Sequence, residues 1–139
     1  MTPTAGYSGT PLVKKLGINP GMRILFVNQP EDYDAILGPL PEGVIRLKEP
    51  QEKMDFIHLF ARHASELRAQ LPELKSTLSQ DGMLWISWPR KTSKMPTDLS
   101  ESVVREMGLG VGLVDVKVAA VDEVWSGHKF VYRLVERKA

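Results

Sequence analysis

Hydrophobic and polar positions follow one another along the chain in the order of a small α/β domain. Short apolar runs rich in β-branched and aromatic residues, bounded by turn signals, predict strands at 23–27, 44–47, 55–60 and 83–88. The run at 83–88 is apolar without alternation, which indicates a strand covered on both faces, as in a parallel sheet. Segments 114–121 and 129–135 do alternate, and they predict a terminal antiparallel hairpin with its turn at 126–128.

Helical spacing of apolar residues predicts helices between these strands, at 11–16, 32–37, 64–78 and 99–107. Thr10 is expected to cap the first helix. Asp98 and Glu101 have the spacing of a capping box that would open the last helix, and Gly108 would end it. Pro72 lies inside the third helix and predicts a kink or two short helices rather than one straight rod.

This order predicts one three-layer α/β domain over residues 1–139, with a mostly parallel sheet and an antiparallel C-terminal hairpin. Residues 1–9 are interpreted as a loosely held arm and residues 136–139 as a frayed tail. Residues 48–53 alone separate the second strand from the third, and seven peptide steps reach at most ~25 Å. Either one helical layer is thin, which we favour, or the second strand runs antiparallel at an edge.

Composition narrows the class of protein. The 139 residues carry a formal net charge of +1 and include no cysteine. The charge balance argues against a nucleic-acid binder, and the lack of cysteine removes disulfides, thiolate zinc sites and cysteine nucleophiles. The first residues lack the layout of a signal peptide, and no apolar run approaches the ~20 residues of a membrane span. We therefore expect a soluble, cytoplasmic protein with neither nucleic acid nor membrane as a partner.

Two resemblances cover most of the chain. Residues 73–87 look like the helix, glycine turn and fifth strand of the class I methyltransferase fold, and the element order over 20–135 resembles that Rossmann-like fold with one unit deleted. The opening at 5–17, the strand end Trp85-Ile86-Ser87-Trp88-Pro89 and the segment 114–127 resemble a family of small uncharacterised bacterial proteins. The second resemblance implies no established activity.

The methyltransferase resemblance implies a site for S-adenosylmethionine (SAM) at the turn after the first strand, where glycines let such a ligand approach. Here the turn at 28–34 has no glycine, and Pro30 offers no N–H. The turn carries three carboxylates, from Glu31, Asp32 and Asp34. These acids are expected to cap the positive helix end themselves, leaving no room and no free amides. Glu49 alone could grip a ribose after the second strand. We therefore predict no cofactor.

Ligands of open α/β sheets bind beyond the carboxyl ends of the strands, where the strand order reverses. The residues that leave the predicted strands there form a candidate ligand-binding rim: Asn28, Gln29, Arg62, His63, Trp88, Arg90 and Lys91. For Trp88 core packing is the favoured alternative, because tryptophan buries a large area. The cations of this rim, with Lys94, could bind an anion, although we favour solvated loop charges. The acids of the first turn make the site mixed in sign, which suits a zwitterionic or polar ligand better than a polyphosphate.

The sequence gives little support for a catalytic site or a metal site. His63 is a candidate general base, but Ser65 is its one near neighbour in sequence, and a structural role at a helix entry is favoured. His58 is predicted to be a satisfied core histidine. Ser87, which lacks the glycines of a nucleophile elbow, is predicted to be a buried hydroxyl. With His128 in a turn, the histidines have no metal-ligand spacing. We predict no catalytic residue and no metal.

The terminal hairpin offers a candidate partner surface at Trp125, Ser126 and Lys129, although a polar turn with Trp125 packed against the sheet is the plainer explanation. The last strand offers an edge through which copies of the chain could associate. The favoured function is that of a non-catalytic binding or regulatory domain, with a small molecule or a protein as its ligand. The alternative is a group-transfer enzyme that uses the same rim, such as a divergent SAM-dependent methyltransferase.

Overall fold

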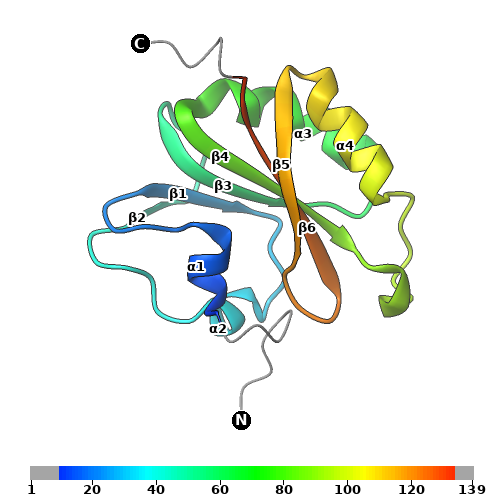
Figure 1. The fold of residues 1–139 in the computed structure, drawn as a ribbon, viewed down its shortest axis with the longest axis horizontal. Helices are drawn as coiled ribbons and strands as arrows, with labels where there is room; N and C mark the ends of the chain where they lie inside the picture. The colour runs from blue at the N-terminus through cyan, green and yellow to red at the C-terminus, as the bar shows by residue number, and fades with distance from the viewer. Residues whose placement is uncertain (1–9, 134–139) are drawn as a thin grey trace.

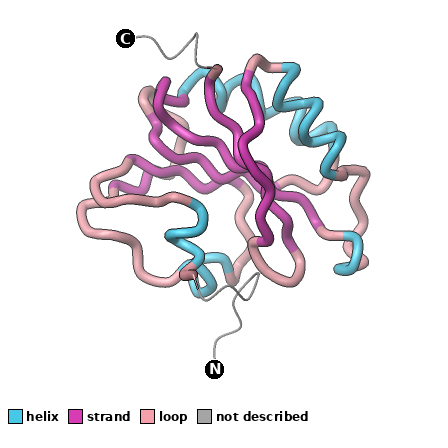
Figure 2. Tube along the Cα trace, in the orientation of Figure 1, coloured by secondary structure: helices cyan, strands magenta, loops and turns pink. Residues whose placement is uncertain are grey.

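The computed structural model describes residues 10–133, and the predicted arm and tail lie outside this range. Six strands form one sheet: β1 (Arg23–Val27), β2 (Ile45–Leu47), β3 (Met54–Phe60), β4 (Leu78–Pro89), β5 (Leu113–Ala120) and β6 (Trp125–Tyr132). The helices are α1 (Leu12–Leu16), α2 (Tyr33–Leu37), α3 (Ala64–Thr77) and α4 (Glu101–Gly110), with a 3-10 turn, η2, at Lys91–Ser93. The sheet lies between a layer of α1 and α2 and a layer of α3 and α4 (Figures 1 and 2).

The strand order is β2-β1-β3-β4-β6-β5. Strands β2, β1, β3 and β4 run parallel to one another, whereas β6 lies between β4 and β5 and is antiparallel to both. The predicted mostly parallel sheet with a C-terminal antiparallel hairpin is thus confirmed. Because β6 lies inside the sheet, the last strand does not offer the predicted edge, which belongs to β5. Arg23 lies opposite Ile45 in parallel register, which settles the direction of the second strand. The connection at 48–53 contains no helix, and α1 and α2 have five residues each, so one layer is indeed thin.

The sheet is buried on both faces, which explains the unbroken apolar run of β4. Leu84, Ile86 and Trp88 belong to the core that α3 and α4 cover, whereas Trp85 belongs to the core beneath α1 and α2. The Trp85 indole N–H donates to the carbonyl of Leu16 at 2.8 Å and ties α1 to the sheet. Alternate side chains of one strand therefore fill two different cores.

Helix α3 runs without interruption through Pro72, so of the two predicted alternatives, a kink or two short helices, the second is wrong. Proline removes the hydrogen bond to the carbonyl of Arg68, and Arg68 is exposed to solvent, which can replace the missing donor. Leu67, Leu71 and Leu74 are buried along one side of the helix and hold both halves against the sheet. Packing outweighs the local cost of the proline.

Three predicted element ends shift. Pro11, not Thr10, occupies the N-cap of α1. Helix α4 is capped by Ser100, whose hydroxyl accepts from the backbone N–H of Val103, and it continues through Gly108 to Gly110. Gly108 has a packing role, because a Cβ there would stand 2.1 Å from the ring of Phe130.

The turn of the hairpin lies at 121–124 rather than at 126–128. The Asp122 carboxylate accepts from the backbone N–H groups of Val124 at 2.8 Å and Trp125 at 2.7 Å, which is how an aspartate side chain stabilises a turn. Gly127 instead lies inside β6, where a Cβ would meet Ser87 and Trp85. The glycine serves a close approach between strands, not a turn.

Candidate functional site

A hollow with a volume of about 540 Å³ opens at the carboxyl ends of β1 and β3. Its lining residues are Asn28, Gln29, Pro30, Glu31, Phe60, Ala61, Arg62, His63, Glu66, Met95 and Trp125. We refer to it as the strand-exit pocket. Four residues of the predicted rim meet here, namely Asn28, Gln29, Arg62 and His63. The turn after β1 therefore borders a hollow that a ligand could enter, at the place where the sequence put Asn28 and Gln29 in the candidate rim.

Trp88, Arg90 and Lys91 do not line this pocket, so the structure does not bring this part of the predicted rim together with the other four residues. Strand β4 stays paired with β6 as far as Pro89, and the alternation of side chains puts Trp88 in the opposite core, 6% exposed. Arg90 Nη1 donates to the Asp122 carbonyl at 3.2 Å. Lys91 begins the 3-10 turn η2 and is exposed.

The turn after β1 is held by side-chain amides. Asn28 has a left-handed backbone with φ of 60°, and its Nδ2 donates to the Phe60 carbonyl at 3.4 Å and to Gln70 Oε1 at 3.0 Å. Asp32 occupies the N-cap of α2 but makes no capping hydrogen bond, and Asp34 instead forms an ion pair of 3.0 Å with Arg46. The predicted self-capping by these acids is therefore not observed at Asp32.

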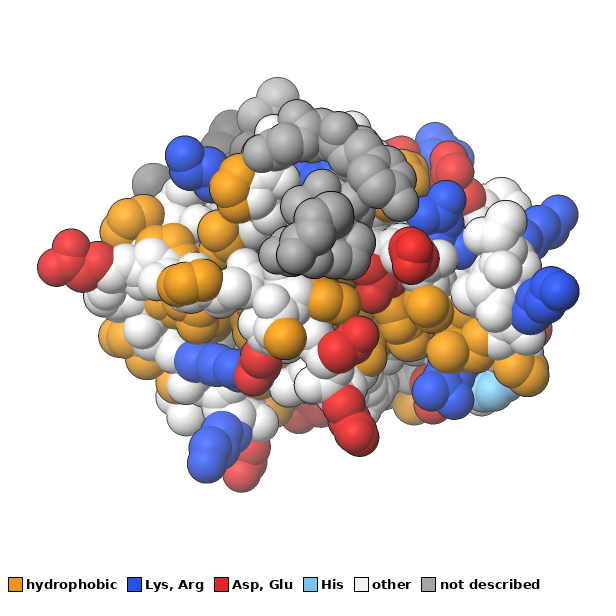
Figure 3. All heavy atoms as spheres, turned by 90° about the horizontal axis from the view of Figure 1, so that it is seen from below, with side chains coloured by type: hydrophobic (Ala, Val, Ile, Leu, Met, Phe, Trp, Pro, Cys, Tyr) orange, Lys and Arg blue, Asp and Glu red, His pale blue; other side chains and the backbone are white. Residues whose placement is uncertain are grey.

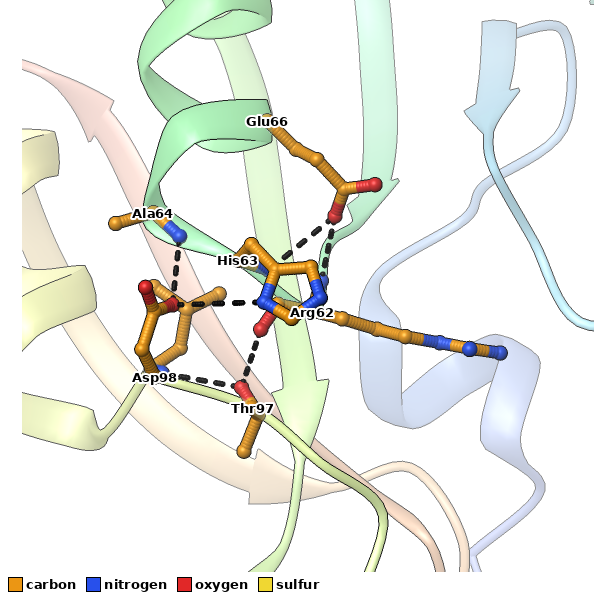
Figure 4. Close-up of polar contacts among 7 residues, drawn as sticks. Arg62, His63, Ala64, Glu66, Thr97 and Asp98 are labelled. Carbon is orange, nitrogen blue, oxygen red and sulfur yellow. Dashed lines mark hydrogen bonds and ion pairs between the residues drawn. The ribbon is translucent and has the colours of Figure 1, made fainter.

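The segment after β3 is fixed from two sides (Figure 4). Glu66 Oε1 accepts from the backbone N–H groups of Arg62 at 2.9 Å and His63 at 3.2 Å, and the bond from Arg62 holds the pKa of Glu66 below its usual range. The segment before α4 contributes Thr97, whose hydroxyl donates to the Arg62 carbonyl at 2.5 Å, and Asp98, which accepts from the N–H of Ala64 at 2.8 Å. Asp98 thus stabilises the start of α3 rather than α4.

His63 gains a carboxylate neighbour that sequence proximity did not show. Its Nδ1 lies 4.0 Å from Asp98 Oδ1, and both side chains are more than half exposed. Figure 4 shows the side chain of Arg62 extending away from this cluster, and its guanidinium makes no ion pair within residues 10–133. The pocket rim therefore carries an arginine without an ion pair in the described residues and a half-exposed histidine that lies beside a carboxylate.

Beneath the pocket lies a buried polar chain that sequence analysis missed. Tyr33 Oη is 2.6 Å from His58 Nδ1, and His58 Nε2 is 2.7 Å from Ser87 Oγ. All three side chains are fully buried. His58 was predicted to be a satisfied core histidine, and the structure confirms this. Ser87 is buried as predicted, but its hydroxyl contacts the side chain of His58 and not the backbone, which was the expected partner. No local pattern could have joined three residues from α2, β3 and β4.

Burial keeps this chain neutral. It lowers the pKa of His58 to about 3 and raises the pKa of Tyr33 above its ordinary value. A neutral imidazole donates from one ring nitrogen and accepts at the other, which matches two hydroxyl neighbours. Phe60 stacks on the His58 ring with centroids 4.1 Å apart, and Trp125 meets Phe60 edge-on at 5.1 Å. The rings that line the pocket floor therefore rest on the buried chain.

The predicted partner surface on the hairpin is not one patch. Trp125 is 6% exposed and belongs to the core beneath α1 and α2, so it offers little area to a partner. Ser126 and Lys129 are partly buried and point to opposite faces of β6, and burial lowers the pKa of Lys129. Figure 3 shows acidic side chains beside an apolar stretch on the lower face of the molecule, with Lys and Arg mostly toward its two ends.

Two further hollows adjoin the pocket on the side of β2. One, of about 350 Å³, is lined by residues of β1 and α3 together with Asn28, Lys48 and Pro50. The other, of about 470 Å³, is lined by Phe26, Gln29, Arg46, Leu47 and Lys48. Lys48 lines both of them, whereas Glu49 lines neither. Glu49, which was predicted to bind a ribose, is therefore not among the residues that line these two hollows.

Residues 10–133 contain no group of histidine and carboxylate side chains that could hold a metal ion. His128 is 2% exposed, and its Nε2 lies 3.3 Å from an Asp115 carboxylate oxygen that also pairs with Arg105 at 3.2 Å. Within the same residues, no helix is long and apolar enough to cross a membrane.

No protein-family model and no curated protein sequence matches this chain. Solved structures do match. A SAM-dependent methyltransferase from Aquifex aeolicus is 20% identical, with a TM-score of 0.61 over 86% of both chains. The N-methyltransferase NodS from Bradyrhizobium japonicum is 13% identical, with a TM-score of 0.58 over 86% of this chain and 90% of that one. The fold is therefore that of the class I methyltransferases, a Rossmann-like α/β fold.

A third similar structure, fibrillarin from Aeropyrum pernix with natively bound SAM, is 12% identical, with a TM-score of 0.57 over 91% of this chain and 71% of that one. The residues of the present chain do not fit a conventional site for this cofactor. Pro30 lines the pocket where glycine-rich turns present N–H groups, and the first residue after β2 is the cation Lys48, whereas Glu49, which follows it, lines neither of the two hollows beside β2. The likeness shown is therefore one of fold.

Proposed function

We propose that the protein is a small-molecule-binding domain, and that its ligand lies in the strand-exit pocket. The observation that carries the proposal is the pocket itself, which opens at the strand ends where ligands of this fold class bind. Glu31 and Arg62 give its rim both signs of charge, and Phe60 and Trp125 give it an apolar floor. A polar or zwitterionic ligand with an apolar part matches this lining.

Some charged side chains that line the pocket already have partners within the protein, and others do not. Glu66 already accepts two backbone N–H bonds, so its carboxylate has a structural role. The Arg62 guanidinium and the Glu31 carboxylate form no ion pair within residues 10–133 and are available to opposite charges on a ligand. Ser87, the buried serine nearest the floor, is fully covered and cannot act as a nucleophile. The lining of the pocket can therefore bind a ligand without any of its residues acting as a catalyst.

Mass spectrometry of small molecules that remain with the purified protein tests this proposal without assuming a ligand. The compound found is then titrated into wild type, Arg62→Ala and the control Arg68→Ala, which removes an arginine outside the pocket lining. Because a hydrogen bond to a charged group contributes about 1.5–3 kcal/mol, Arg62→Ala should weaken binding about 10- to 100-fold. Undiminished binding to Arg62→Ala would contradict the proposal.

A second candidate is an enzyme that performs a group transfer in the same pocket. The observation in its favour is Asp98 Oδ1 at 4.0 Å from His63 Nδ1, because a carboxylate beside one ring nitrogen can orient a histidine as a base. Incubation with the identified ligand, with and without SAM, tests this candidate. Turnover that His63→Gln abolishes while binding persists would establish the enzyme and displace the non-catalytic proposal.

A further inference from the structure

The end of the site beside β2 has a different chemistry from the strand-exit pocket. The hollow of about 470 Å³ there has two cations, Arg46 and Lys48, and one amide, Gln29, among its lining residues, and no acid. Gln29 also lines the strand-exit pocket, so the two hollows adjoin. We propose that this end binds a phosphate group, carried by the same ligand that occupies the pocket. The inference rests on the proposed function, because it concerns the same site.

The two cations differ in how they are held. The Arg46 guanidinium lies 4.5 Å above the Phe26 ring, and its Nη1 contacts Asp34 Oδ2 at 3.0 Å, so its position is fixed by two neighbours. Lys48 forms no ion pair or hydrogen bond within residues 10–133. Asp34 offsets the charge of Arg46, so Lys48 supplies the uncompensated positive charge of this hollow. An ammonium on a flexible stem can follow a phosphate at the rim.

The charges facing Lys48 from the other side are also known. The smaller hollow that it lines is bounded on α3 by Gln70 and Glu73. Glu73 is the acid among the lining residues there, and Gln70 is engaged with Asn28 at 3.0 Å. A phosphate is therefore directed to the side of Phe26 and Gln29, away from Glu73.

The position of Lys48, directly after β2, indicates which ligand group its charge would bind. In dinucleotide-binding α/β folds, an acid near the end of the second strand accepts hydrogen bonds from ribose hydroxyls, and a cation there accommodates a phosphate. Lysine and arginine are donors without acceptor capacity, so they match a phosphate, which is acceptor-rich. Among the residues that directly follow β2, the one that lines this hollow is the cation Lys48 and not the acid Glu49, which favours a phosphate over a ribose hydroxyl there.

Isothermal titration calorimetry with adenosine and adenosine 5′-monophosphate tests the inference, because the two probes differ by one phosphate. Titrations use wild type, Lys48→Gln and the control Lys91→Gln, an exposed lysine outside these hollows, at about 50 mM salt, where screening is weak. Wild type and the control should bind the monophosphate at least about tenfold more tightly than adenosine, and inorganic phosphate should compete. Lys48→Gln should remove that difference.

Three results would overturn the inference. They are equal affinities of wild type for both probes, no binding of the monophosphate, and equal losses in Lys48→Gln and Lys91→Gln, which would indicate non-specific charge attraction. The failure of the proposed function looks different. If the ligand that remains with the purified protein depends on Arg62 but not on Lys48, the pocket binds a ligand and the phosphate assignment alone is wrong.

Discussion

The buried histidine His58 makes the stability of the protein depend on pH in a window where carboxylates contribute little. Its ring is fully buried between Tyr33 and Ser87, and burial lowers its pKa to about 3 in the folded protein, against 6.5 for an ordinary histidine. In the unfolded chain the ring recovers its ordinary pKa. Below pH 6.5 the ring is therefore protonated in the unfolded state, whereas in the folded state it stays neutral down to about pH 3.

The sign and size of the effect follow from linkage. Stability is complete above pH 6.5 and falls as the pH drops toward 3, with a limiting slope of about 1.4 kcal/mol per pH unit. Between pH 7 and pH 5 the free energy of unfolding should fall by about 2 kcal/mol from this group. That amount is a large fraction of the roughly 5–15 kcal/mol by which domains are typically stable.

Urea denaturation at pH 7, 6 and 5 measures this loss directly. His58→Gln supplies a neutral amide and should show a flat profile over the same window, whereas the control His63→Gln should keep the wild-type slope. If His58→Gln does not fold, NMR of the wild-type ring nitrogens at pH 5 should still show a neutral His58. A wild-type profile that is flat between pH 7 and pH 5, or a protonated ring at pH 5, would refute the reasoning.

Three further substitutions test the packing that holds the site. Ser87→Ala leaves one buried histidine nitrogen without its partner and should lower the free energy of unfolding in urea by about 1–3 kcal/mol. Gly108→Ala puts a methyl group 2.1 Å from a ring carbon of β6 and should cost about 1–3 kcal/mol, whereas Gly110→Ala, with open space, should be neutral or stabilising by thermal denaturation. Asp122→Ala removes two turn hydrogen bonds and should cost about 1–2 kcal/mol, against no measurable change in Glu123→Ala. Wild-type stability of Ser87→Ala would contradict the role of that hydrogen bond. Equal unfolding midpoints of the two glycine variants, or of the two acid variants, would contradict the role given to Gly108 or to Asp122.

Much of the fold could be predicted because apolar runs report burial directly. The unbroken run of β4 indicated a strand between two layers, and the short connection at 48–53 indicated a thin layer. Errors arose where a side chain serves a distant element. Asp98 has the spacing of a local capping box but accepts from α3, and Gly127 follows a turn-like residue but serves a close contact with β4.

The site was predictable in part for a similar reason. The exits of β1 and β3 follow from strand order, so Asn28 and His63 could be placed together. The orientation of Trp88 depends on where β4 ends and pairs, which the sequence does not determine. The polar chain of Tyr33, His58 and Ser87 joins three distant segments, and each residue alone has an ordinary pattern.

A crystal structure of the protein with the small molecule that remains bound through purification tests the central claim most directly. The account predicts ligand density in the strand-exit pocket, against Phe60 and Trp125 and within hydrogen-bond distance of Arg62. Density elsewhere on the molecule with this pocket empty would contradict the claim. SAM lodged along the turn at 28–34 would contradict the argument that this turn does not fit that cofactor.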